Sequence, residues 1–298
     1  SPFNDDFVFE LKFLKTYLNN FLAANLKINF RKDHWILEGI QHYYIKKYID
    51  ENYPEVKSFG KLSRLGILKK YKIINMNFSE QFIYNYLLMA RRNIDQAVGT
   101  DKNTQIKFNE KIAGKFKSGL SLHYLNQYLE HNIVENSIKE FVQKNKNKIT
   151  NNKDFKSILE TKSNQNLDWF FNELIYSRNK IDYKITNAKK ANDSIEVTIK
   201  NMGDAKVPVS IYGYNNNKLV SKNWVENNTE TFKFYVKNDS ITKLVLNDNY
   251  EIPEINNNNN SYKLKNRFLG NRKIRFTFFK DIENAKYNQV FYVPTAEF

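Results

Sequence analysis

Apolar residues recur at helical spacing through roughly the first 180 residues of the chain. The pattern predicts a first helix around residues 7–22, a second from the N-cap candidate Asp33 to about Ile49, and a third over about 79–95 opened by Ser79. Further helices are predicted at about 105–130, 135–147, 152–160 and 166–177. We expect the apolar stripes to pack a core; they comprise Phe7, Leu11, Leu14, Leu18, Phe21 and Leu22, and then Leu120, Tyr124, Leu125, Tyr128 and Leu129.

The pattern changes near Ile181, where apolar and polar residues begin to alternate. The alternating positions are Ile195, Val197 and Ile199, then Val207, Val209 and Ile211, then Phe232, Phe234 and Val236, then Leu244 and Leu246. Residues 201–204 between the first two runs have turn chemistry. Short strands at such intervals predict a small antiparallel β-sandwich at about 182–255, with Trp224 in its core or stacked between strands.

Three segments follow from these patterns. Residues 1–180 form a mainly helical part, 181–262 a β-sandwich, and 263–298 a strand-like tail that we expect to continue in a longer protein. The asparagine run 256–260 is interpreted as a loop without function. In the tail, Arg272–Phe279 and Val290–Val293 are aromatic and strand-like. We therefore expect a protein of the bacterial envelope, periplasmic or associated with the outer membrane.

The amino-acid composition and charge of the chain exclude several classes of function and site. The chain has 298 residues with 47 Lys and Arg against 32 Asp and Glu, a net charge of +15 that attracts polyanions weakly. The basic residues are dispersed apart from short clusters such as Lys69-Lys70 and Arg91-Arg92, so no specific nucleic-acid site is expected. The absence of cysteine excludes disulfides and thiolate metal sites. No apolar run is long enough to predict a transmembrane helix, and no signal peptide opens the sequence.

Residues 33–40 read DHWILEGI, with Tyr43 and Tyr44 shortly after. This segment resembles the tryptophan-leucine-x-glutamate-glycine segment of the M1 aminopeptidases, a family of gluzincin zinc enzymes. The resemblance continues through KFKSG at 115–119, LHYL at 122–125, residues 141–171 and residues 201–209, and covers about 5–255. It implies an α+β multidomain protein: the mainly helical C-terminal half of a thermolysin-like peptidase domain, followed by a small antiparallel β-sandwich. It also implies that Glu38 occupies the position of the third zinc ligand.

The other catalytic positions depart from the family. The resemblance places the His-Glu-x-x-His run at residues 15–19, where this chain has Lys15, Thr16 and Asn19 at the first histidine, the glutamate and the second histidine. A catalytic zinc requires imidazoles and a general base there. The oxyanion-stabilising tyrosine of the family falls on Lys115, or on Phe116 after a shift of one residue. We therefore expect neither zinc nor peptidase activity.

The histidines near Glu38 offer a second possible metal site. His34, Glu38 and His42 lie on one helical face, but His34 and His42 are about 12 Å apart along the axis. Partly exposed histidines that hydrogen-bond nearby groups are the favoured interpretation, also for His123 and His131. Glu38 requires a cationic partner, and Lys15 is the candidate. The remnant of the substrate cleft would be lined by Trp35, Tyr43, Tyr44 and Tyr124, and would hold a peptide or polymer.

Three functions remain open from the sequence. The first is a peptidase-like binding or scaffold module of a larger bacterial envelope protein, without zinc or catalysis. The alternative is an active zinc aminopeptidase whose ligands come from residues outside this chain. The third is a purely electrostatic binder of polyanions.

Overall fold

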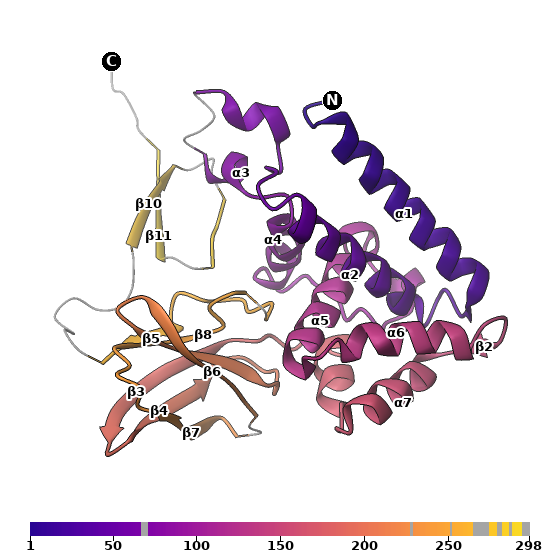
Figure 1. The fold of residues 1–298 in the computed structure, drawn as a ribbon. Helices are drawn as coiled ribbons and strands as arrows, with labels where there is room; N and C mark the ends of the chain where they lie inside the picture. The colour runs from indigo at the N-terminus through magenta and orange to yellow at the C-terminus, as the bar shows by residue number, and fades with distance from the viewer. Residues whose placement is uncertain are drawn as a thin grey trace. The chain divides into compact units, whose positions relative to one another are not determined.

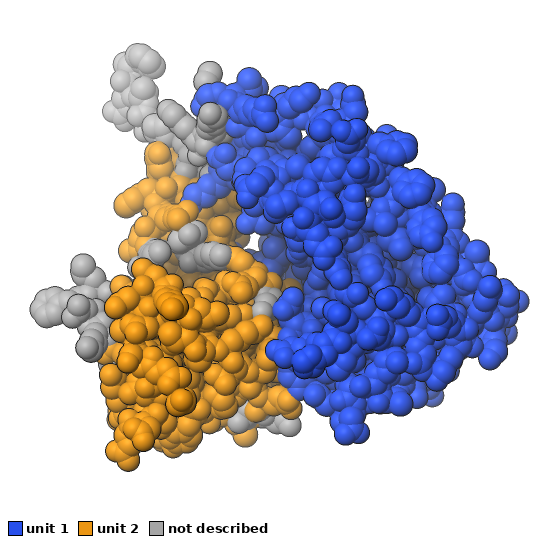
Figure 2. Space-filling view, viewed as in Figure 1, with its two compact units in different colours: residues 1–178 blue, residues 179–298 orange. Residues whose placement is uncertain are grey.

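The computed structural model describes residues 1–66, 71–226, 229–250, 252–264, 274–278, 282–285 and 288–293 (Figure 1). The chain divides into two compact units, residues 1–178 and residues 179–298 (Figure 2). The predicted boundary lay at residue 180, and the separate tail over 263–298 stays a prediction. None of the helices in the described part of the chain has the length and apolar content that a bilayer crossing requires.

Unit 1 is mainly helical, as the fold class predicted. Its α-helices are α1 (Asp5–Asn25), α2 (His34–Asn52), α3 (Lys72–Asn75), α4 (Glu80–Ala90), α5 (Gly114–Leu129), α6 (Ile133–Lys144) and α7 (Asn152–Ser163). The 3-10 turns η1 (Gly60–Arg64) and η3 (Lys102–Thr104) and the π-helical turns η4 (Asn109–Ala113) and η5 (Phe170–Ile175) lie among them. Strand β1 (Lys27–Ile28) pairs in parallel with β2 (Ile149–Thr150).

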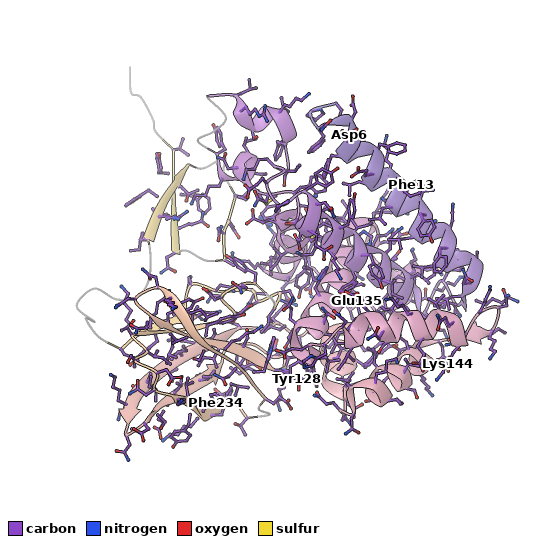
Figure 3. The ribbon with its side chains drawn as sticks, viewed as in Figure 1. Asp6, Phe13, Tyr128, Glu135, Lys144 and Phe234 are labelled. Atoms are coloured by element: carbon purple, nitrogen blue, oxygen red, sulfur yellow. The ribbon has the colours of Figure 1, made fainter. Side chains whose placement is uncertain are left out.

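The helix α1 buries one stripe and exposes another. Phe7, Leu18 and Leu22 are buried, whereas Phe9, Phe13, Tyr17 and Phe21 are between 41% and 70% exposed. The four exposed rings follow each other at four-residue spacing, with centroids 6.4, 6.2 and 5.8 Å apart and interplanar angles of 20° or less; Figure 3 shows where Phe13 lies on α1. The prediction that Phe21 belongs to the core is wrong, because Phe21 lies on this exposed row beside the buried one.

Unit 2 consists of two antiparallel sheets and the short pair that follows them. One sheet has the order β3 (Tyr183–Ala191), β4 (Ser194–Asn201) and β7 (Thr231–Lys237). The other has the order β6 (Lys218–Val225), β5 (Val209–Asn215), β8 (Lys243–Leu246) and β9 (Ser261–Lys263). In β4 burial alternates residue by residue, so Ile195, Val197 and Ile199 face the core. The predicted antiparallel β-sandwich is confirmed.

The last described strands are β10 (Ile274–Phe278) and β11 (Asn288–Tyr292), which pair in parallel. They fall in the two segments predicted to be strand-like. Arg272, Lys273 and Phe279 of the first predicted strand lie outside the described residues, as do Lys69 and Lys70.

The asparagine run has a structural role that the sequence interpretation missed. Glu254 is fully buried, and its carboxylate accepts hydrogen bonds from the backbone N–H of Tyr183 at 2.6 Å and from the side-chain amides of Asn260 at 2.6 Å and Asn247 at 3.1 Å. The amide of Asn259 donates to the carboxylate of Asp182 at 3.0 Å. The run is a loop, as predicted, and it supplies hydrogen-bond donors to the buried Glu254 and to the partly exposed Asp182.

Candidate functional site around Glu38

The carboxylate of Glu38 is held by two ammonium groups. Glu38 lies near the start of α2, and its side chain is 15% exposed. Nζ of Lys102 donates a hydrogen bond to Oε1 of Glu38 at 2.9 Å. Nζ of Lys115 lies 3.4 Å from the same oxygen. Both lysine side chains are themselves about three-quarters buried, so solvent screens the cluster less than it would screen a surface pair.

Local structure brings each lysine to this place. The backbone N–H of Lys102 donates to the carbonyl of Arg31 at 2.9 Å, which ties η3 to the segment before α2. The side chain of Asp101 caps η3 by accepting from Asn103 N–H. Lys115 stands in the first turn of α5, and α5 packs closely against α2 because glycines face the contact: Gly39 from α2 and Gly119 from α5.

The cluster carries an excess of positive charge. Two ammonium groups face one carboxylate at Glu38, and the neighbouring Glu110 already has Lys111 as an ion-pair partner at 3.1 Å. The hydrogen bond from Lys111 lowers the pKa of Glu110, and Lys102 and Lys115 act in the same direction. The two ammonium groups on Glu38 therefore disfavour a further cation at this carboxylate.

The donor set does not fit a catalytic zinc. Within the described part of the chain, no three His, Cys, Asp or Glu residues come together as a metal would require. Lys15, Thr16 and Asn19 have exposed side chains on α1. Thr16 lines a hollow on the surface of α1 together with Phe13 and Tyr17. At the positions that the resemblance assigns to the family's zinc site, the chain has a carboxylate, an amine, a hydroxyl and an amide, and no imidazole.

The predicted ion pair between Lys15 and Glu38 is wrong. Among the described residues, the lysines within 4.0 Å of Glu38 are Lys102 and Lys115. Lys15 contacts α2 through its backbone instead, since its carbonyl oxygen accepts a hydrogen bond from Nε2 of Gln41 at 2.9 Å. Its exposed ammonium group is free to stay hydrated, which avoids the cost of burying a charge.

The histidines on α2 form ordinary hydrogen bonds, as predicted. Nδ1 of His42 lies 2.8 Å from the carbonyl oxygen of Glu38, and Nδ1 of His34 lies 3.3 Å from that of Arg31. The expectation of partial exposure is wrong for both, because His34 and His42 are buried in the helical core. Burial lowers the pKa of His42 to about 4. Of these two histidines, His34 is the one near the Glu38 carboxylate, with 4.0 Å between Nε2 and Oε2.

The other two histidines of the chain, His123 and His131, do not lie together either. Nε2 of His123 lies 3.0 Å from the carbonyl oxygen of Tyr43, and burial lowers the pKa of His123 to about 3. His131 is exposed beyond the end of α5, with a φ of 47°. The two do not form a common site.

Three of the four residues predicted to line a cleft lie in the core instead. Trp35 is fully buried against the rings of Phe155, Phe170 and Phe171. Tyr43 and Tyr124 are also buried; the first donates its hydroxyl to Glu135 at 3.0 Å, and the second packs on Trp169. Tyr44 lines an apolar groove of about 430 Å³ bounded by α1, α2 and α6. The aromatic residues near Glu38 in sequence are therefore mainly packing residues.

Lys102 is the site residue that sequence reasoning did not single out. It lies 64 positions after Glu38 in the chain, in a short turn with no motif around it. A buried carboxylate signals that a cation must exist, but nothing in the sequence indicates which of the many lysines reaches it.

Comparison with known proteins supports the fold. No family model and no curated protein matches this chain. Among solved structures, the crystal structure of Legionella pneumophila aminopeptidase A in complex with aspartic acid is similar, with a TM-score of 0.55 at 12% sequence identity. The match covers 80% of this chain and 26% of that aminopeptidase, so the chain spans about a quarter of the length of that protein. At this identity the likeness shows a peptidase-like fold alone.

Proposed function

We propose that this chain is a peptidase-like module that neither holds a catalytic zinc nor hydrolyses peptides, and that serves as a binding or scaffold part of a larger protein. The observation that carries the proposal is the pair of lysines on Glu38, with Nζ of Lys102 at 2.9 Å and Nζ of Lys115 at 3.4 Å from Oε1. The envelope setting belongs to the same proposal and rests on the aromatic, strand-like segments near the end of the sequence.

Charge balance explains why the lysine pair opposes a metal. A divalent zinc bound by Glu38 would stand beside two ammonium groups, and the like charges would repel it. One of the two carboxylate oxygens, Oε1, already accepts a hydrogen bond from Lys102. Lys115 also occupies the position that the resemblance to M1 aminopeptidases assigns to the oxyanion-stabilising tyrosine. At that position the chain has an ammonium group in place of a phenol, and this ammonium group is already paired with the carboxylate of Glu38.

The same geometry indicates what the module would bind. Its positive excess attracts an acidic group, such as a carboxylate of a peptide or another anionic polymer. A ligand bound without zinc and without a general base would not be hydrolysed by the known metallopeptidase route.

Metal analysis and activity measurements on the purified chain test the proposal. We expect far less than one zinc per chain after equilibration with zinc and dialysis, and no hydrolysis of an alanyl anilide. Stoichiometric zinc together with turnover would refute the proposal. The alternative, an active zinc aminopeptidase with ligands from outside this chain, predicts instead that zinc and activity emerge in a longer form of the protein.

A variant of the chain tests whether Lys15 and Asn19 stand at the positions of the family's two histidine ligands. Lys15→His combined with Asn19→His and Lys102→Ala supplies two imidazoles and removes one opposing ammonium. If these positions correspond to the family's zinc ligands, the variant binds zinc more tightly than the wild-type chain. Lys15 and Asn19 are exposed on α1, and Glu38 keeps Lys115 as its ion-pair partner when Lys102 is replaced, so the fold should be retained. A variant with Asn20→His, Ala24→His and Lys102→Ala has the same number of added imidazoles, also four positions apart on exposed residues of α1, and serves as the control.

A further inference from the structure

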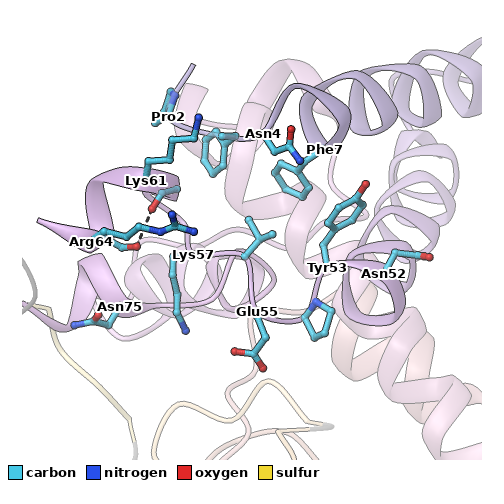
Figure 4. Close-up of a pocket in the computed structure, with 15 residues that line it drawn as sticks. Pro2, Asn4, Phe7, Asn52, Tyr53, Glu55, Lys57, Lys61, Arg64 and Asn75 are labelled. Carbon is cyan, nitrogen blue, oxygen red and sulfur yellow. Dashed lines mark hydrogen bonds between the residues drawn. The ribbon is translucent and has the colours of Figure 1, made fainter.

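A second pocket in unit 1 lies apart from the Glu38 cluster and has no part in the proposal above. It has a volume of about 620 Å³ and lies between the N-terminal residues, the end of α2, the loop after α2 and η1 (Figure 4). Its volume falls in the range of pockets that hold small organic ligands. Aromatic rings and cationic side chains both contribute to its lining.

The wall of this pocket is fixed by backbone contacts. The backbone N–H of Lys61 donates to the carbonyl oxygen of Pro2 at 2.6 Å. Gly60 makes this contact possible, since its φ is 53° and a β-carbon there would come within 2.2 Å of the Pro2 oxygen. Ser63 Oγ donates to the Gly60 carbonyl at 2.7 Å, the dashed line in Figure 4. The pocket is therefore formed before a ligand arrives.

Aromatic rings supply an apolar surface inside the pocket. The rings of Phe3 and Phe7 lie 5.5 Å apart, and those of Phe7 and Tyr53 lie 5.0 Å apart, edge to face. The Tyr53 hydroxyl donates to the carboxylate of Glu10, so this phenol is already satisfied. The rings offer apolar contact and no hydrogen-bonding group.

Cations border these rings. Lys57, Lys61 and Arg64 line the pocket against a single acid, Glu55. Lys57 donates to the side chain of Asn77. In the described part of the chain, neither Lys61 nor Arg64 has a carboxylate within 4.0 Å, and Figure 4 shows Arg64 extending from η1 toward Phe7 and Tyr53. A guanidinium with this freedom can bind a carboxylate or phosphate through two parallel hydrogen bonds.

We propose that this pocket binds a small organic anion, with a carboxylate or phosphate head on Arg64 and Lys61 and an apolar or aromatic body on the partly exposed rings of Phe3 and Tyr53. Lys61 and Arg64, which have no carboxylate partner among the described residues, lie beside an aromatic surface, and this arrangement selects for such amphiphilic anions over inorganic ions, which gain nothing from the rings. It also selects against neutral aromatic molecules, which gain nothing from the cations.

Ligand binding measured by calorimetry and NMR tests this assignment. The probes are phenyl phosphate and benzoate, with inorganic phosphate and benzyl alcohol as the two half-ligands. We expect saturable binding of at least one full probe, and binding of each half-ligand at least about tenfold weaker. No saturable binding of either full probe up to about 10 mM would overturn the proposal.

Charge-reversal variants locate the site. Arg64→Glu places a carboxylate where the head group would bind, and we expect at least about tenfold weaker binding of the probes. Lys12→Glu makes the same charge change on an exposed residue of α1 that does not line the pocket, and should leave binding unchanged. An equal loss in both variants would indicate general attraction by the net positive charge and would refute the pocket. Since both residues are exposed, neither change should unfold the chain.

Discussion

Gly119 of α5 lies directly against His42 of α2. A β-carbon added at Gly119 would come within 2.7 Å of the β-carbon of His42 and 3.0 Å of its carbonyl carbon. Such distances are shorter than van der Waals contact allows, so the two helix backbones approach as closely as they do because residue 119 has no side chain. This contact sets the position of α5 and with it the reach of Lys115 to Glu38.

Replacing Gly119 with alanine should therefore destabilise unit 1. The overpacking costs about 1–3 kcal/mol, of which the better helix propensity of alanine returns up to about 1 kcal/mol. Urea denaturation followed by the helical circular dichroism signal measures the difference. Gly39→Ala on the facing helix is the matched control, because its added β-carbon would meet only side-chain and carbonyl atoms at 3.3 Å or more. A Gly39 variant as unstable as the Gly119 variant would contradict this account.

Removing the Glu38 carboxylate should leave two ammonium groups facing each other. Glu38→Ala takes away the shared partner of Lys102 and Lys115, and the remaining like charges repel while one loses its hydrogen bond. We expect a loss of about 1–3 kcal/mol in the free energy of unfolding, and a smaller loss at high salt, where the repulsion is screened. Glu110→Ala, which breaks the pair with the more exposed Lys111, should cost less than about 1 kcal/mol.

Periodicity predicted the elements well where one face of an element is buried and the other is exposed. The stripe Leu120, Leu125 and Leu129 on α5 is buried, and the alternation in β4 separates core from solvent residue by residue. The resemblance placed Glu38 and Lys115 at two positions of one site, and their side chains lie 3.4 Å apart.

Periodicity does not predict side-chain positions correctly where a helix is surrounded by other elements. The first three turns of α2 are buried on most of their circumference, so periodicity does not reveal which residues face a cleft and which face the core. Trp35 and Tyr43 were expected in a cleft for that reason and lie in the core. Lys102 could not be found because ion pairs between distant segments depend on the path of the chain. The helix α1 carries two neighbouring apolar rows, and periodicity alone does not show which row is buried. Phe21 was therefore expected in the core although it belongs to the exposed row.

Shortening a side chain should lower the stability of unit 1 much more in the buried row of α1 than in its exposed aromatic row. Leu22 is buried, so Leu22→Ala should cost about 2–5 kcal/mol through lost burial and the cavity left behind. Phe13 belongs to the exposed aromatic row, where neighbouring rings at four-residue spacing contribute only about 0.2–0.5 kcal/mol per pair. Phe13→Ala should therefore change stability by about 1 kcal/mol at most. Urea denaturation of both variants measures the contrast, and a Phe13 variant as unstable as the Leu22 variant would show that this row is covered in solution.

Glu254 predicts how the stability of unit 2 depends on pH. Burial raises the pKa of Glu254 to about 8, above the value of an unfolded glutamate. The folded state then binds the proton more tightly, so the contribution of Glu254 is present at low pH and is lost as the pH rises toward 8. The buried histidines titrate below pH 6.5 and act in the opposite direction there, which leaves pH 6.5–8 as the informative window. Hydrogen exchange of β3 and β8 should report a fall of up to about 1.4 kcal/mol per pH unit. Glu254→Gln removes the titrating group and should abolish this slope, and the glutamine amide oxygen can still accept the hydrogen bond from the backbone N–H of Tyr183. A slope that persists in the variant would assign the pH dependence to another group.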